Sequence, residues 1–152
     1  LKIPESSFIG IDFSLESIKT ANKIKKQLNL DNIDFAHSDM NNIKYPDKYF
    51  DYIVDTQSIY YSKDYLETFN HLKKKLSSYG ILITMPGIGE KNQIKLYINQ
   101  IQTAGFSVQD FRFIKAINLG ETEHLPVITC SLKEPKESID TDSIITKLFN
   151  SV

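Results

Sequence analysis

Residues 8–14 read FIGIDFS, a short apolar run that closes on Asp12 and is followed by Ser14. A bounded apolar run of this length indicates a strand buried on both faces. Ser14 is a typical helix N-cap, and Glu16 falls in the first turn, where the helix dipole favours negative charge. Apolar residues then recur at helical spacing, at Ile18, Ala21, Ile24 and Leu28. The stretch predicts a strand, a tight turn and an amphipathic helix.

Two further strand-like runs follow, and each again ends on an acid. Residues 33–39 alternate apolar and polar side chains and end at Asp39, which is typical of a strand near a sheet edge. Residues 50–55 form the next run and end at Asp55. The repeated pattern predicts parallel strands separated by helices.

Helical patterns separate the later strands. Asp64 is the start signal of a helix that is expected to stop at Gly80. Residues 81–85 predict a fourth strand, broken by Pro86, and residues 91–104 predict a third helix. The chain therefore belongs to the α/β class.

The pattern changes after the third helix. Residues 106–114 and 126–132 are strand-like runs, joined by a loop expected over residues 118–125. An antiparallel pair is the economical interpretation. We expect one partial domain over residues 1–134 and a C-terminal tail over residues 135–152, either a short docked helix or a frayed end.

Composition excludes several classes of protein. The chain has 152 residues, 41% of them hydrophobic and 24% charged, as in an ordinary globular domain. No apolar run approaches the roughly 20 residues of a membrane-spanning helix, and the start lacks a signal peptide, so a cytoplasmic protein without membrane contact is expected. A net charge of -1 with a single arginine, Arg112, argues against a nucleic-acid groove.

The sequence predicts neither a metal site nor a phosphate loop. Cys130 has no ligand-spaced cysteine or histidine beside it and is expected in the core, while His37, His71 and His124 are scattered. Residues 87–89, GIG, follow a strand, but the third glycine of the dinucleotide fingerprint is absent, which favours a plain loop.

Candidate binding residues follow from the strand ends. In a doubly wound sheet, ligands bind outside the carboxyl ends of the parallel strands, and Asp12, Asp39, Asp55 and Gly87 occupy such positions. A carboxylate there can accept hydrogen bonds from both hydroxyls of a ribose. Asp12 fits this role; the alternative is that it only caps the helix that begins after Ser14.

The order of these features resembles the class I S-adenosylmethionine-dependent methyltransferases. It comprises the IGIDFS run, the acid at Asp39, the YFDYIV run and the GILI strand. The likeness covers roughly residues 8–132 and includes the late antiparallel pair, which sets this family apart from dinucleotide-binding dehydrogenases. It implies a doubly wound, Rossmann-like, mostly parallel sheet flanked by helices, with S-adenosylmethionine as the cofactor.

The resemblance also implies roles for individual residues at the adenosine end of the cofactor. Asp12 matches the acid that binds the ribose, and Phe13 is implied to lie beside the adenine. Asp39 matches the acid that accepts a hydrogen bond from the adenine amino group, with Met40 packed near the ring.

The methionine end and the substrate entrance are implied after the third run. Asp55 and Thr56 match residues that line the methionine moiety, and Tyr60 and Tyr61 fall in the family's variable, substrate-facing stretch. If the methyl acceptor must lose a proton, the candidate bases are Asp55, Tyr60, Tyr61 and His124. The amino-methylating signature, an Asn or Asp before two prolines and an aromatic, is absent, which favours a small-molecule acceptor over DNA or protein.

One departure from the family concerns its first strand and glycine-rich loop, which should precede Phe8. In the family this strand lies between the strands that here end at Asp12 and Asp55, so its removal leaves two rows of backbone groups unpaired, each costing about 1–3 kcal/mol if buried. We expect a longer N-terminus, a second chain or a rearrangement to fill the gap. Two alternatives remain open: a degenerate scaffold or regulatory subunit without activity, and a nicotinamide dehydrogenase, which the closing strand pair disfavours.

Overall fold

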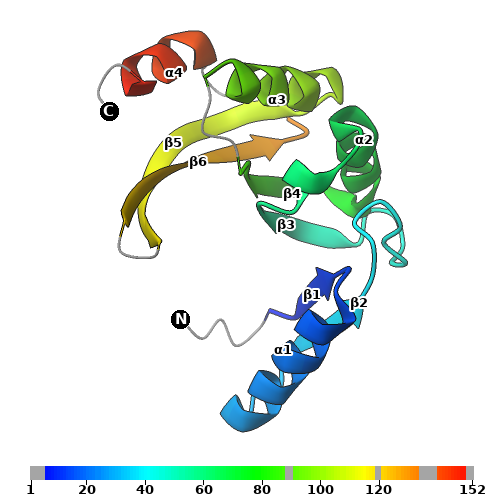
Figure 1. Cartoon of the computed structure of the whole chain (residues 1–152). Helices are drawn as coiled ribbons and strands as arrows, with labels where there is room; N and C mark the ends of the chain where they lie inside the picture. Colours follow the sequence, from blue (N-terminus) through cyan, green and yellow to red (C-terminus); the bar gives the residue numbers. More distant parts are fainter. Residues whose placement is uncertain (1–5, 88–90, 119–120, 134–139, 150–152) are drawn as a thin grey trace. The chain divides into compact units, whose positions relative to one another are not determined.

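The chain folds into two compact units, Leu1–Lys44 and Tyr45–Val152. The computed structural model in Figure 1 describes residues 6–87, 91–118, 121–133 and 140–149. Within these ranges, no helix is both long enough and apolar enough to cross a membrane. The expected α/β class is confirmed, with parallel strand pairs, flanking helices and a C-terminal antiparallel pair.

The first unit is a strand, helix and strand. Its elements are β1 (Phe8–Asp12), α1 (Leu15–Leu28) and β2 (Ile33–His37), and the two strands pair in parallel. Ser14 caps α1 as predicted, because its Oγ accepts a hydrogen bond from the Ser17 N–H at 3.2 Å. The strands also require a glycine: a Cβ on Gly10 would lie 2.6 Å from the Phe35 ring.

The second unit is a four-stranded sheet in the order β3-β4-β6-β5. Its elements are β3 (Phe50–Thr56), η1 (Ile59–Tyr61), α2 (Tyr65–Lys75), β4 (Leu76–Met85), α3 (Lys91–Thr103), β5 (Ser107–Asn118), β6 (Glu121–Ser131) and α4 (Thr141–Phe149). β3 pairs with β4 in parallel, whereas β6 pairs with both β4 and β5 in antiparallel fashion. β4 is therefore hydrogen-bonded along both edges.

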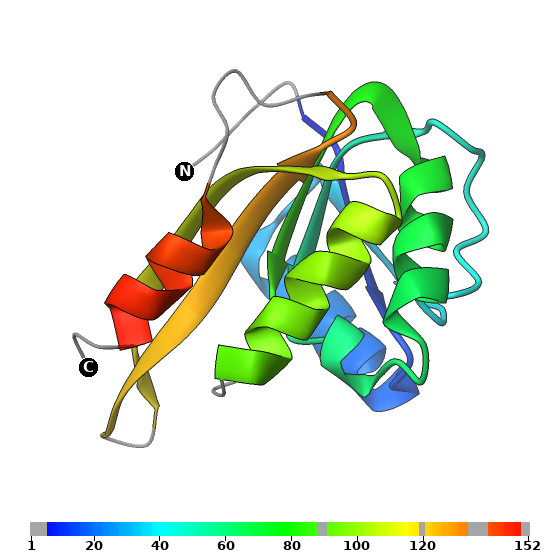
Figure 2. The same cartoon turned by 90° about the horizontal axis from the view of Figure 1, so that it is seen from above.

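The core of the second unit lies between one face of the sheet and three helices. Figure 2 shows α2, α3 and α4 side by side over this face. Its sheet side is supplied by Leu82, Thr84, Ile128 and Cys130, all fully buried. The helices contribute Phe69, Leu72, Ile94, Tyr97, Ile98, Ile101 and Ile145. The core position expected for Cys130 is confirmed, and burial raises the pKa of its thiol to about 12.

The C-terminal segment carries a docked helix, which decides between the two expected alternatives. α4 packs on β5 through Phe113 and Phe149, whose ring centroids are 5.9 Å apart. Asp142 in its first turn forms an ion pair with Lys95 of α3 at 2.6 Å.

Two predicted boundaries are wrong. α2 ends at Lys75 and not at Gly80, because Leu76 pairs opposite Phe50 and is buried, so the chain is already extended there. The loop expected over residues 118–125 is also wrong, since β5 runs to Asn118 and β6 begins at Glu121, with the two strands paired throughout. Ladder pairing overrides the weak strand propensity of both stretches.

Among the described residues, four strands have one open edge: β1, β2, β3 and β5. Among the described residues, β1 pairs only with β2, and β3 pairs only with β4. On β3, Tyr52 and Val54 alternate with Asp55 and so face away from the helices; their exposed fractions are 63% and 61%. An apolar, exposed edge strand is an uncommon way to end a sheet.

We expect Leu82→Ala to lower the free energy of unfolding by about 2–5 kcal/mol, because it empties a fully buried site in β4. The matched control is Leu96→Ala on α3, where the leucine is 54% exposed and the loss should stay below about 1 kcal/mol. Urea unfolding followed by circular dichroism measures both. Equal losses would contradict the placement of the core between sheet and helices.

Candidate functional site

In the first unit, Asp12 is the last residue of β1 and Phe13 follows it. Asp12 Oδ1 accepts a hydrogen bond from the Ser14 N–H at 2.7 Å and so holds the turn before α1, whereas Ser14 is the helix cap. Among the described residues, its Oδ2 accepts no hydrogen bond within 3.5 Å, which leaves one carboxylate oxygen for a ligand hydroxyl. The Phe13 ring beside it is 72% exposed.

The residues after β2 lie beside this strand end. The Ser38 N–H donates to the Asp12 carbonyl at 3.0 Å, and His37 Nε2 lies 2.8 Å from the Phe13 carbonyl oxygen. Asp39 is exposed, and its Oδ1 accepts from the Asn41 N–H at 2.8 Å. The structure therefore brings Asp12, Phe13 and Asp39 together at the carboxyl end of the β1-β2 pair.

In the second unit, Asp55 is the last residue but one of β3 and is buried, with an exposed fraction of 6%. Its Oδ1 accepts hydrogen bonds from the N–H groups of Ser58 at 2.8 Å and Ile59 at 3.1 Å. Its Oδ2 accepts from the Thr84 hydroxyl at 2.8 Å, and that hydroxyl lies 2.6 Å from the Tyr97 hydroxyl. Both carboxylate oxygens are thus occupied by protein donors.

Burial controls the protonation of this buried group. Desolvation raises the pKa of Asp55 above its ordinary value of 3.8, and the hydrogen bonds from Thr84, Ile59 and Ser58 offset part of that rise. Desolvation likewise raises the pKa of the Tyr97 phenol, which stays protonated and able to donate.

The turn that follows β3 presents two phenol rings. Tyr60 and Tyr61 stack edge to face with centroids 5.4 Å apart, and their exposed fractions are 46% and 74%. Thr56 is also exposed. Asp55 and Thr56 are the last two residues of β3 and point to opposite faces of the strand, and Tyr60 and Tyr61 lie in the turn that follows.

His124 does not lie in a loop, contrary to expectation. Its backbone is part of β6 and pairs opposite Lys115. Residues 88–89 of the GIG stretch fall outside the described residues, whereas a Cβ added to Gly87 would lie 3.6 Å from the side chains of Gln57 and Tyr60.

Sequence reasoning missed Thr84 and Tyr97. Thr84 lies within the apolar run of β4, and Tyr97 shares the helical spacing of Ile94 and Ile101 on the buried face of α3. Both patterns therefore indicate positions in the apolar core. A hydroxyl in an otherwise apolar strand or face was the available signal, because buried hydroxyls need a partner.

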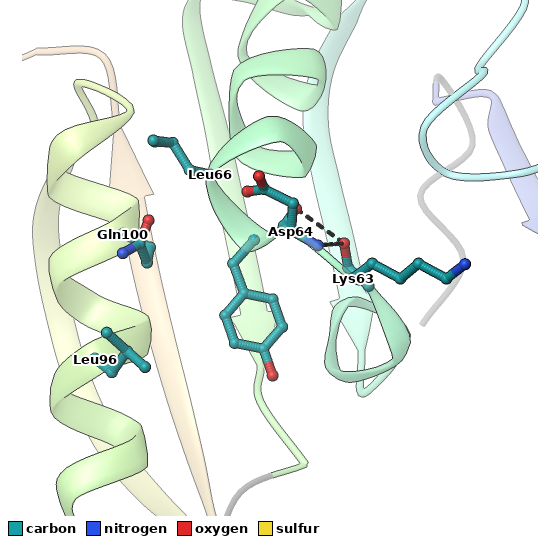
Figure 3. Close-up of a pocket in the computed structure, with 7 residues that line it drawn as sticks. Lys63, Asp64, Leu66, Leu96 and Gln100 are labelled. Atoms are coloured by element: carbon teal, nitrogen blue, oxygen red, sulfur yellow. Dashed lines mark hydrogen bonds between the residues drawn. The ribbon is translucent and has the colours of Figure 1, made fainter.

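A shallow cavity of about 530 Å³ lies between the start of α2 and α3. Figure 3 shows Leu96 and Gln100 on α3 facing the start of α2, with Lys63 extended away from α3. The cavity contains none of the predicted site residues. Within the described ranges, no group of three or more His, Cys, Asp or Glu side chains is placed to hold a metal ion.

Comparison with known families gives one matching domain model. A family model described as "Methyltransferase domain" matches residues 1–124. The chain belongs to the methyltransferase domain family. Family membership implies S-adenosylmethionine as the cofactor, and the free Asp12 Oδ2 beside the exposed Phe13 ring fits the ribose and adenine of that molecule. Comparison with curated protein sequences gives no match.

Solved structures confirm the fold of this methyltransferase. An S-adenosylmethionine-dependent methyltransferase from Aquifex aeolicus has a TM-score of 0.67 at 17% identity, over 84% of this chain and 70% of its own. A methyltransferase from Haloferax volcanii, solved with the activator Trm112, has a TM-score of 0.72 at 14% identity, over 85% and 73%. The [4+2]-cyclase SpnF has a TM-score of 0.70 at 14% identity, over 86% and 67%.

We expect Asp55→Asn to change how the stability of this methyltransferase depends on pH. Because burial raises the pKa of Asp55 in the folded state, its contribution to stability is complete below pH 3.8 and declines as the pH rises through the folded-state pKa. The neutral amide lacks this decline. The free energy of unfolding of the wild type should therefore fall relative to Asp55→Asn as the pH rises from about 4 towards neutrality.

Urea unfolding at several pH values measures this difference. A difference that is constant with pH, or one that grows in favour of the wild type as the pH rises, would contradict a raised pKa.

Proposed function

We propose that this chain transfers a methyl group from S-adenosylmethionine to a small-molecule acceptor. The observation that carries the proposal is the strand-end carboxylate of Asp12, with one oxygen left for a ribose hydroxyl beside the exposed Phe13 ring, in a chain of the methyltransferase domain family. When bound, the cofactor supplies a methyl group on an already activated sulfonium, so the chain needs no nucleophile of its own.

Residues of the first unit are proposed to bind and orient the adenosine part of the cofactor. Asp12 accepts from the ribose, Phe13 and Met40 pack by the adenine, and Asp39 accepts from the adenine amino group. Asp39 Oδ1 already accepts from Asn41, which holds the carboxylate in one orientation. Preset orientation of this kind lowers the entropy cost of binding.

On the second unit, the acceptor is proposed to meet Thr56, Tyr60 and Tyr61. All three are exposed, and two phenol rings offer apolar area together with hydroxyl groups. Residues 55–58, DTQS, lack the proline pair of amino-methylating enzymes, which supports a small molecule. Any base is proposed among Tyr60, Tyr61, His124 and Asp55, although Asp55 would first have to release its hydrogen bonds.

We further propose that a strand from outside residues 1–152 supplies the first strand that the family resemblance implies and pairs with an open strand edge. It comes either from a longer N-terminus or from a partner chain. The unpaired backbone edges of β1 and β3 among the described residues support such a strand, since open edges favour pairing. The Haloferax volcanii neighbour, solved with an activator protein, makes a partner chain a realistic source.

A second candidate function is a scaffold or regulatory subunit without activity. The observation that favours it is that protein donors occupy both oxygens of Asp55, while the cavity between α2 and α3 contains none of the predicted site residues. A cytoplasmic location remains our expectation in either case.

We expect a version of the chain extended before Leu1 to bind S-adenosylhomocysteine and the 152-residue chain to bind it weakly or not at all, because unpaired strand edges loosen both units. Isothermal titration calorimetry measures binding, and sedimentation velocity measures assembly. Binding by neither version supports the scaffold. A stable monomer of 152 residues that binds as tightly as the extended version would contradict the missing strand.

In the version that binds, we expect Asp12→Asn to weaken binding of S-adenosylhomocysteine about 10- to 100-fold, as for loss of a hydrogen bond to a charged group. Asparagine keeps the Oδ1 that accepts from Ser14, so the turn is preserved. The matched control is Asp34→Asn, an exposed acid on β2 that pairs with Lys25. Equal affinities for wild type and Asp12→Asn would refute the ribose contact.

A further inference from the structure

A buried chain of hydrogen bonds runs from α3 through β4 to the end of β3. Tyr97, Thr84 and Asp55 are its members, and Tyr97 and Thr84 are both fully buried. An ionised carboxylate only accepts, so the Thr84 hydroxyl gives its single proton to Asp55 and accepts from Tyr97. The hydrogen bonds are therefore donated in one direction, from Tyr97 to Thr84 and from Thr84 to Asp55 Oδ2.

Asp55, the last member of this row of hydrogen bonds, holds the turn that follows β3. Asp55 Oδ1 accepts from the N–H groups of Ser58 and Ile59, which begin the η1 turn. Ile59 is 1% exposed and anchors the turn in the core. Carboxylate, turn and core residue together fix the backbone at this point.

The same turn is held where it leaves β3. Gln57 has a φ of 68°, a left-handed conformation that residues other than glycine adopt at a cost. Its N–H donates to the Met85 carbonyl at the end of β4 at 3.0 Å. The hydrogen bond to Met85 thus helps to hold Gln57 in a left-handed conformation that its side chain disfavours.

The turn carries two exposed aromatic side chains. Tyr60 and Tyr61 follow Ile59 directly, and their edge-to-face pair is largely open to solvent. Exposed aromatic side chains on a rigid turn form a preorganised recognition surface.

We propose that Thr84 and Tyr97 are positioning residues: through Asp55 they fix the Ser58–Tyr61 turn, and with it the Tyr60 and Tyr61 rings that meet the methyl acceptor. This inference rests on the proposed function for the part that concerns the acceptor. The positioning itself is a property of the chain without any ligand.

The alternative is that the three residues only fill space. Tyr97 does pack edge-on against Tyr65 and Phe69, with centroids 5.3 and 5.2 Å away. Apolar side chains of the same shape would serve that purpose without burying a carboxylate, which is costly unless its hydrogen bonds are used. The hydroxyl groups, and not the rings, therefore carry the proposed role.

The test removes and restores one hydroxyl. Thr84→Val keeps the shape and deletes the donor to Asp55, whereas Thr84→Ser keeps the donor. The matched control is Thr129→Val on β6, a threonine opposite Ile83 whose side chain lies on the other face of the sheet. Tyr97→Phe is a milder second variant, because the ring and the Thr84–Asp55 bond both remain.

The protein is labelled with 3-fluorotyrosine, and the fluorine resonances of Tyr60 and Tyr61 are assigned with Tyr60→Phe and Tyr61→Phe. We expect Thr84→Val to shift or broaden both resonances and to speed amide exchange at Ser58 and Ile59 about tenfold or more. Thr84→Ser should restore the wild-type spectrum, Tyr97→Phe should give a smaller change of the same kind, and Thr129→Val should give none.

Wild-type resonances and amide exchange in Thr84→Val would overturn the proposal, as would a change that Thr84→Ser fails to restore. Binding of S-adenosylhomocysteine is measured separately on the wild type. Its absence would count against the proposed function alone, because the fluorine spectrum and the exchange rates require no cofactor.

Discussion

The interior position of β4 is the constraint on which the larger unit depends. Every backbone N–H and C=O group inside a sheet must find a partner, and β4 finds them in β3 on one edge and β6 on the other. This pairing sets the register that places Asp55 beside Thr84 and Thr84 beside Ile128. It also decides which face receives α2, α3 and α4. The apolar core and the buried polar chain both follow from that register.

Much of the fold could be predicted because local signals and tertiary pairing agree. β1, α1 and β2 have matching apolar periods, a serine cap and turn residues, and they form where those signals indicate. The end of α2 could not be predicted, because a glycine is a strong local stop but Leu76 gains more by pairing with Phe50 and entering the core. The β5-β6 hairpin likewise extends through polar residues because each strand supplies the other's hydrogen bonds.

The positions of the strand-end acids could be predicted from the sequence, but their hydrogen-bond partners could not. Apolar runs that close on an acid mark the carboxyl ends of strands, and the structure confirms that Asp12 and Asp55 lie there. Thr84, which donates to Asp55, lies 29 positions away from it in the chain, and Tyr97, which is bonded to Thr84, lies a further 13 positions away. Such contacts depend on strand register and helix rotation, which periodicity alone does not reveal.

Asp12 and Asp55 share one sequence pattern and differ in what their oxygens meet. One carboxylate oxygen of Asp12 accepts a hydrogen bond in the turn before α1. Its other oxygen and the neighbouring Phe13 ring remain available to a ligand. Asp55 stands next to a strand whose facing residue is a buried hydroxyl, so the protein itself uses both of its oxygens. The side chain at the adjacent register position therefore decides how the second oxygen of Asp55 is used. In this chain, that side chain is Thr84.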